Sequence, residues 1–107
     1  MSAREVEPVV VLGLGRFGQS VAFALTREGC EVLAIDRDER AVNEIAPIVT
    51  HALELDATDA VALRAAGAAD FRFAVVAISG HPEASIFATM ALKNLGVGTV
   101  IAKAANS

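Results

Sequence analysis

The segment VVVLGLGRFG, residues 9–18, constrains the fold of this chain more than any other stretch of it. It joins four consecutive apolar residues to the pattern G-x-G-x-x-G, and a helical pattern follows at once. An apolar run of this length predicts a strand that is buried on both faces. A strand that leads through such glycines into a helix is typical of a dinucleotide-binding unit, in which phosphates lie at the start of the helix.

Each glycine of the pattern has its own expected task. Gly13 makes the tight turn out of the strand, where a side chain is unfavourable. Gly15 leaves bare backbone for a phosphate to approach, and Gly18 lets the new helix pack closely on the sheet. The free N–H groups at the helix start, together with the positive end of the helix dipole, then favour an anion.

Asp36 supplies the second part of the signature. It follows an apolar run at residues 32–35 and lies about 20 residues beyond the glycines. A carboxylate at this point can accept hydrogen bonds from both hydroxyls of an adenosine ribose. The alternative is that Asp36 only caps the next helix. Arg37 beside it leaves a small opening for a 2′-phosphate, although the acid argues against NADP.

The rest of the chain alternates between strand and helix patterns. We predict strands at residues 9–12, 31–35, 49–55, 71–78 and 99–102, and helices at 16–28, 38–46, a short alanine-rich stretch before Gly67, and 82–95. This alternation predicts an α/β fold: a Rossmann-like, doubly wound parallel sheet with strand order 3-2-1-4-5. We expect residues 1–107 to form one domain, a fragment of a longer protein that lacks a sixth strand.

Three of the predicted helices carry more specific expectations. In the first helix, the predicted inward face is Phe17, Val21, Ala24, Leu25 and Glu28. Thr58 or Asp59 is expected to cap the alanine-rich helix. The last helix is apolar on more than one face, through residues such as Ile86, Phe87 and Met90, which is consistent with a subunit interface or with ordinary core.

Composition excludes several classes of function. The net charge is −4 and the chain has no basic run, which argues against a nucleic-acid-binding surface. Cys30 is the only cysteine, so no disulfide can form within the chain. No run of 18 apolar residues and no secretory signal is present, so we expect a cytoplasmic protein.

The predicted topology brings the polar segments to one edge of the sheet. In doubly wound sheets, ligands bind beyond the carboxyl ends of the strands, where the strand order reverses. The segments that follow the five predicted strands are 13–18, Asp36, 56–58, 79–81 and Lys103. We therefore predict a single binding site along this edge.

The residues also resemble a known family. The segments GLGRFGQSVAFALTREGCEVLAID, THALELDATD and VVAISGHPEASIFATMALKNLGVGTVIAKAAN are similar to the nucleotide-binding lobe of the RCK or KTN domains, the cytosolic gating subunits of Ktr and Trk potassium transporters. The resemblance covers residues 9–106. It implies homodimers that assemble into an octameric ring beneath a membrane-embedded potassium channel subunit, with nucleotide exchange changing the ring's shape.

The resemblance also implies a ligand and the residues that hold it. The Gly-Arg-Phe-Gly turn is more similar to the Ktr branch, which responds to ATP and ADP, than to the Trk branch, which also binds NAD and NADH. ATP or ADP is therefore the first expected ligand and NAD or NADH the second. Leu55 stands where the family often has glycine, a departure beside the residues that would border the adenine.

The expected contacts divide the site by the parts of the nucleotide. Gly13, Gly15 and Gly18, with Arg16 and Phe17 in the same turn, would hold the phosphates, with Arg16 at the terminal phosphate. Asp36, beside Arg37, would hold the ribose; Asp56, Ala57 and Thr58 would border the adenine; and Ile78, Ser79 and Lys103 would lie near the phosphates.

Three functions compete on these grounds. The first is a ligand-sensing gating module without chemistry, in which the ligand shifts an assembly between two states. The second is the cofactor lobe of an NAD-dependent dehydrogenase, for which His81 is the one acid–base candidate at the site. The third is a structural scaffold, which would leave Asp36 and Arg16 without a purpose. The resemblance favours gating, so we assign no catalytic residue and no metal ligand.

Overall fold

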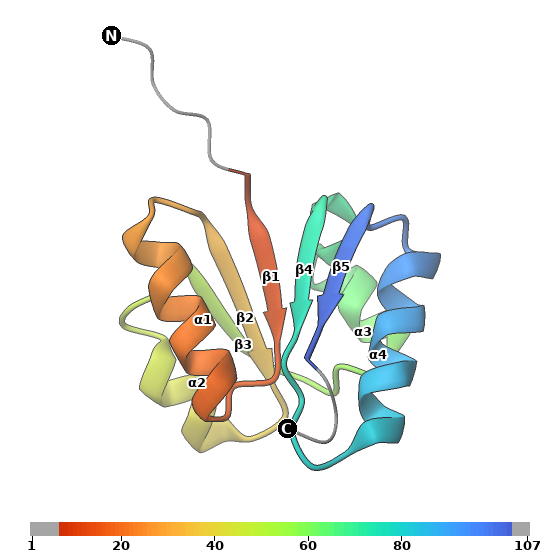
Figure 1. Cartoon of the computed structure of the whole chain (residues 1–107), viewed down its shortest axis with the longest axis horizontal. Helices are drawn as coiled ribbons and strands as arrows, with labels where there is room; N and C mark the ends of the chain where they lie inside the picture. The colour runs from red at the N-terminus through yellow and green to blue at the C-terminus, as the bar shows by residue number, and fades with distance from the viewer. Residues whose placement is uncertain (1–6, 104–107) are drawn as a thin grey trace, which may run out of the picture.

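Five parallel strands form the centre of the molecule, in the order β3-β2-β1-β4-β5 (Figure 1). The computed structural model describes residues 7–103. The strands are β1 (Val9–Leu12), β2 (Val32–Asp36), β3 (His51–Glu54), β4 (Phe73–Val76) and β5 (Thr99–Ala102). The helical segments are α1 (Arg16–Arg27), α2 (Glu39–Ile45), α3 (Ala60–Ala65), the 3-10 turn η1 (Ala68–Asp70) and α4 (Pro82–Asn94). The predicted fold class and strand order are confirmed.

The helices form a layer on each face of the sheet (Figure 1). Helices α1 and α2 cover one face, and α3 and α4 cover the other. Strand β1 serves both cores, because Val10 and Leu12 pack on the side of α3 and α4 while Val9 and Val11 pack on the side of α1 and α2. The continuous apolar run of β1 follows from this position between two layers.

The ends of three strands differ from the prediction, and β2 begins and ends one residue later than residues 31–35. Strand β3 is shorter than residues 49–55, because Val49 is buried in the core beneath α2 before the strand begins. Strand β4 is shorter than residues 71–78, because Phe71 ends the unpredicted turn η1. Apolar residues that pack in the core outside a ladder look the same in a sequence as residues inside one. The predicted helix ends at residues 28, 46 and 95 each extend one residue too far.

The predicted inward face of α1 is partly wrong. Gly18 and Ala22 are the buried residues of this helix, and Val21 is half-buried against the same core. Phe17 is 41% exposed and Ala24 is exposed. The close packing of Gly18 against the backbone of Gly13 determines which face of α1 turns toward the sheet. A pattern of apolar side chains cannot reveal a contact that is possible only because glycine has no side chain.

The other helix expectations have mixed outcomes. Asp59 caps α3, since its carboxylate accepts hydrogen bonds from the N–H groups of Val61 and Ala62, so Thr58 is not the cap. In α4, Ala91 and Leu92 belong to the core, whereas Ile86, Phe87 and Met90 are 58%, 57% and 54% exposed. The breadth of the apolar surface of α4 therefore exceeds what the sheet covers.

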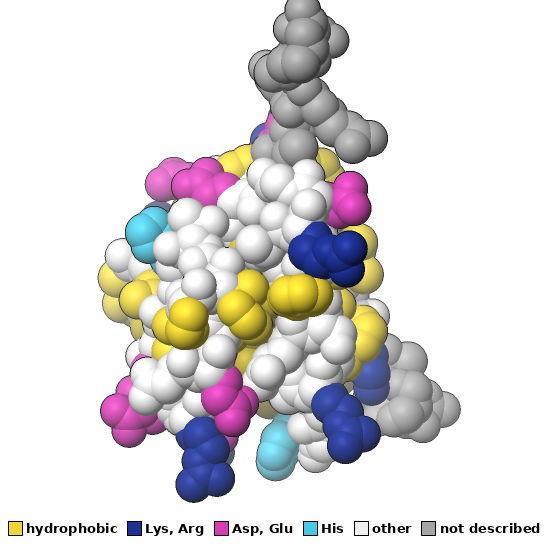
Figure 2. All heavy atoms as spheres, turned by 90° about the vertical axis from the view of Figure 1, so that its left-hand side faces the viewer, with side chains coloured by type: hydrophobic (Ala, Val, Ile, Leu, Met, Phe, Trp, Pro, Cys, Tyr) yellow, Lys and Arg dark blue, Asp and Glu magenta, His cyan; other side chains and the backbone are white. Residues whose placement is uncertain are grey.

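The outer side of the α1 and α2 layer is mixed in character (Figure 2). Hydrophobic side chains form a band across the middle of this view, with charged side chains above and below it. Among the exposed large hydrophobic residues of the molecule, Phe23 belongs to α1, Ile48 follows α2, and Leu53 belongs to the edge strand β3.

Candidate functional site

A cleft of about 520 Å³ opens at the carboxyl ends of the strands, and we call it the strand-end cleft. It lies where the strand order reverses, between the segments that follow β1 and β4. It brings together most of the residues predicted for the site: Gly13, Gly15, Asp36, Arg37, Asp56, Ala57, Thr58, Ile78 and Ser79. Segments far apart in the sequence thus meet at one place.

The three glycines are required for different reasons. Gly13 has a φ of +99°, and a Cβ there would lie 2.8 Å from backbone atoms of Ala77. A Cβ on Gly18 would lie 1.7 Å from the carbonyl oxygen of Gly13. Gly15 has a φ of −72°, and a Cβ there would meet nothing within 4 Å. The fold therefore explains the glycines at 13 and 18, but it does not require one at 15.

The helix starts around the cleft differ in how they are capped. Asp38 caps α2 by accepting from the N–H of Arg40, and Asp59 caps α3. No side chain caps α1 at Gly15 or α4 at His81, and both of these residues line the strand-end cleft. The first N–H groups of a helix have no partner within it, so these two ends direct donors and positive dipole ends toward the cleft.

Asp36 holds the backbone at the start of the site. One carboxylate oxygen accepts from the N–H of Leu14 at 2.6 Å, and the other accepts from the N–H of Asp38 at 2.8 Å. Asp36 therefore ties the loop after β1 to the loop after β2, and it is not the cap of α2. Each carboxylate oxygen has a second lone pair, so the group can still accept hydrogen bonds from a ligand.

Asp56 and Thr58 form a turn that also lines the strand-end cleft. The hydroxyl and the N–H of Thr58 both donate to one carboxylate oxygen of Asp56, at 2.7 and 2.9 Å. These two bonds, with a smaller contribution from the charge of Arg37, hold the pKa of Asp56 below its ordinary value. Asp56 is therefore a fixed negative charge at neutral pH, and Arg37 is a cation close enough to act on it.

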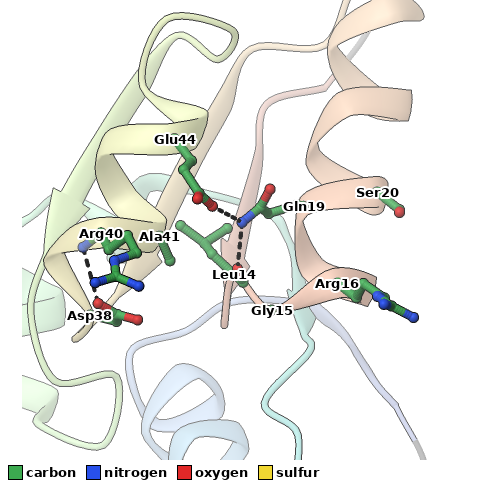
Figure 3. A pocket seen from close by; sticks show the side chains of 9 residues that line it. All are labelled: Leu14, Gly15, Arg16, Gln19, Ser20, Asp38, Arg40, Ala41 and Glu44. Carbon is green, nitrogen blue, oxygen red and sulfur yellow. Dashed lines mark hydrogen bonds between the residues drawn. The ribbon is translucent and has the colours of Figure 1, made fainter.

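Four of the predicted residues lie outside the strand-end cleft. Arg16 lines a second hollow of about 500 Å³ between α1 and α2, which we call the inter-helix cleft, and its side chain points away from Leu14 and Asp38 (Figure 3). The ammonium of Lys103 lies 5.7 Å from the centre of the Phe17 ring, a cation–π contact that joins the end of β5 to the start of α1. Gly18 is buried against Gly13.

Several lining residues were not predicted from the sequence. Leu14, Glu83, Ala84 and Phe87 all line the strand-end cleft. The position of Phe87 in the second turn of a helix that begins at the cleft is the signal that could have found it. Its ring is 57% exposed, and it adds an aromatic side chain to the lining of the cleft.

A family model and several relatives match this chain. Residues 9–107 match the model of the TrkA-N domain. The chain belongs to the TrkA-N domain family. It is 49% identical over 96 residues to the Ktr system potassium uptake protein C of Bacillus subtilis, which covers 90% of the chain and 43% of that relative. It is 42% identical over 96 residues to the Ktr system potassium uptake protein A of the same species, with the same shares covered.

Solved structures with low sequence identity share the fold. A TrkA-N domain of the inner membrane protein ybaL from Escherichia coli superimposes with a TM-score of 0.67 at 13% identity, covering 94% of this chain and 90% of that one. The NAD(P)-binding domain of an exopolyphosphatase-related protein from Archaeoglobus fulgidus gives a TM-score of 0.79 at 19% identity, covering 92% and 74%.

The chain covers less than half the length of the Ktr relatives. It spans 43% of the length of each of the two Ktr proteins that it matches. Between residues 7 and 103, no helix is long and apolar enough to cross a membrane.

Proposed function

We propose that this TrkA-N domain is the nucleotide-binding lobe of a regulatory subunit in a potassium uptake system. It binds an adenine nucleotide in the strand-end cleft and performs no chemistry on it. The binding free energy shifts an assembly of subunits between two shapes, and this change gates ion flow through a membrane partner. The resemblance of the two Ktr proteins over 90% of the chain supports the link to potassium uptake.

One observation carries the assignment of a nucleotide. Gly15 has an ordinary backbone conformation and open space where a side chain would be, so neither strain nor crowding within the domain calls for glycine. It stands at the uncapped start of α1, beside the carboxylate of Asp36. A phosphate group that approaches the backbone there explains the glycine and the uncapped helix, and the ribose of the same nucleotide explains the adjacent acid.

ATP or ADP is the proposed ligand, with NAD or NADH as the second choice. Arg16 stands at the start of α1, where a cation opposes the helix dipole unless an anion is bound. Its side chain lines the inter-helix cleft, outside the strand-end cleft, and we assign it to the terminal phosphate of a nucleotide that extends past Gly15, because a planar guanidinium pairs well with phosphate oxygens. Discrimination between ATP and ADP at this residue is then the switch, because a ligand shifts an equilibrium only by its differential affinity for the two states.

The proposed assembly follows the same family relation. The domain forms homodimers that assemble into an octameric ring at the cytoplasmic side of a membrane-embedded potassium channel subunit. The exposed apolar residues Ile86, Phe87 and Met90 on α4 supply the kind of surface that a subunit contact needs.

A panel of thermal shifts and calorimetric titrations with ATP, ADP, NAD and NADH tests the ligand. The adenine nucleotides should stabilise the chain, and Asp36→Ala should weaken ADP binding by about tenfold or more, which corresponds to ~1.4 kcal/mol. Arg16→Ala should narrow the difference in affinity between ATP and ADP. Equal losses for both nucleotides would assign Arg16 a general role, and the absence of binding by any of the four would contradict the proposal.

The alternative is the cofactor lobe of an NAD-dependent dehydrogenase. It is favoured by one observation, the position of His81 on the wall of the strand-end cleft, where an acid–base group would be needed. This alternative predicts NADH binding well above ATP binding, with His81→Ala abolishing hydride exchange. ATP or ADP binding above NADH binding excludes it.

A further inference from the structure

Leu14 is the fixed point of the loop that joins β1 to α1. Its side chain is fully buried in the core beneath α1 and α2. Its N–H donates to Asp36 at 2.6 Å, and its carbonyl oxygen accepts from the side-chain amide of Gln19 at 3.0 Å. Both polar groups of this residue are thus held by side chains from outside the loop.

Gln19 is itself held by a second helix. Its amide nitrogen also donates to a carboxylate oxygen of Glu44 on α2, at 3.0 Å (Figure 3). A primary amide nitrogen has two hydrogens, so it can make both bonds at once. The carboxylate of Glu44 is an acceptor only, which fixes the orientation of the Gln19 amide, with its nitrogen toward Leu14.

The planarity of the peptide bond carries this orientation to the site. The carbonyl of Leu14 and the N–H of Gly15 belong to one trans peptide and point in opposite directions. A carbonyl that is fixed toward Gln19 therefore fixes the Gly15 N–H on the other side of the peptide. Gly15 lines both the inter-helix cleft, where Gln19 lies, and the strand-end cleft.

We propose that Gln19 is a positioning residue for nucleotide binding: it fixes the Leu14–Gly15 peptide so that the Gly15 N–H faces the phosphate, and Glu44 orients Gln19. This inference rests on the proposed nucleotide site and deepens it. Through Glu44, helix α2 then contributes to nucleotide binding, although α2 is not part of the glycine-rich turn. Loss of the Gln19 amide or of the Glu44 carboxylate leaves the Leu14–Gly15 peptide free to rotate. Nucleotide affinity then falls, although no atom that contacts the nucleotide has been removed.

The test separates this role from simple stabilisation of the two helices. Gln19→Glu places a carboxylate against the Leu14 carbonyl and against Glu44, and it should weaken ADP binding about tenfold or more and lower the melting temperature. Adding Glu44→Gln restores a donor–acceptor pair between α1 and α2 but supplies no donor from position 19 to Leu14. In this double variant the melting temperature should recover while ADP affinity stays low.

Two further variants complete the design. Gln19→Met has a similar length and no donor, and it should weaken ADP binding about fivefold if Gln19→Glu does not fold. Ser20→Ala is the matched control, because Ser20 lines the same inter-helix cleft with its side chain turned away from Leu14 (Figure 3). The amide resonance of Gly15 in the ligand-free chain should move in every variant at position 19 and remain in place in Ser20→Ala.

The results distinguish the inference from the function on which it rests. ADP affinity that recovers together with the melting temperature in the double variant would overturn the positioning role, as would wild-type affinity in Gln19→Glu. Failure of the wild-type chain to bind ADP would instead overturn the proposed function, and the inference with it.

Discussion

At the scale of single residues, the glycine-rich turn separates what the fold needs from what a ligand needs. Gly13 and Gly18 are fixed by contacts within the domain, through a positive φ and a Cβ position that backbone atoms occupy. Neither constraint applies to Gly15. Three glycines that look equivalent in the sequence therefore belong to two different categories, and substitution by alanine distinguishes them.

Gly15→Ala should change the free energy of unfolding by less than about 1 kcal/mol, because the backbone is unstrained and the added methyl meets open space. The same variant should weaken ADP binding about tenfold or more, since the methyl occupies the approach of the phosphate. Chemical denaturation and calorimetry measure the two quantities.

Gly18→Ala is the matched variant, and its expected effect is on the free energy of unfolding. Its methyl would overlap the carbonyl oxygen of Gly13, so we expect a loss of more than about 3 kcal/mol of stability. Equal destabilisation by the two variants, or unchanged ADP affinity in Gly15→Ala, would remove the reason for placing a phosphate at Gly15.

The carboxyl group of Asp56 gives a prediction that depends on pH. The hydroxyl and N–H of Thr58 lower its pKa, so the folded state binds this proton less readily than the unfolded state. The resulting stabilisation is fully present above the unfolded pKa and is lost as pH falls through the folded pKa. Thr58→Val removes the largest cause, and the pKa of Asp56 should rise toward its ordinary value in a carbon-detected NMR titration. An unchanged pKa would show that the hydroxyl bond is not formed in solution.

At the scale of secondary structure elements, the start of α3 shows how one capping residue is selected. Asp59 accepts two backbone hydrogen bonds from α3, while Thr58 turns its hydroxyl back to Asp56. Asp59→Ala should therefore lower the free energy of unfolding by about 1 kcal/mol, measured by denaturant titration. A larger loss of unfolding free energy in Thr58→Ala would show that Thr58, and not Asp59, caps α3.

The sequence predicted the order and type of the elements, because buried strands and amphipathic helices leave strong periodic patterns. Strand β1, which spans Val9–Leu12 as predicted, is a clear example. The sequence did not predict the rotation of α1, which is set by the contact of Gly18 with Gly13. Strand ends were also missed, because Val49 and Phe71 are apolar residues that pack outside the ladder, and a single segment does not show where pairing with a neighbour begins.

The site was predictable to the extent that it follows from topology. Segments after parallel strands meet at one edge, which brought Gly13, Asp36 and Thr58 to the same cleft. The amide of Gln19 meets Glu44 across 25 positions in sequence, and such a side-chain pair has no local signature. Phe87 reaches the cleft because α4 begins there, a placement that depends on how the helix packs.

At the scale of the whole molecule, the exposed apolar side chains of α4 bear on assembly. If Ile86, Phe87 and Met90 form the proposed subunit contact, Met90→Glu should convert dimers or larger assemblies to monomers, because it would bury a charge in that contact. Sedimentation velocity measures the change. Val61→Glu is the control, since Val61 is 79% exposed on another helix.

A monomeric wild-type chain at concentrations of tens of micromolar, or equal dissociation by Val61→Glu, would contradict a contact through α4. The two outcomes differ in meaning. The first would place the contact outside this domain, and the second would show that added negative charge alone separates the subunits.

The most direct measurement is a titration of the isotope-labelled chain with ADP, followed through the amide resonances of the whole backbone. The proposed function predicts that the largest changes occur in residues 13–18, at Asp36 and at residues 57–58, all near the carboxyl ends of the strands. Changes centred on the opposite ends of the strands, or no change at millimolar ADP, would contradict it.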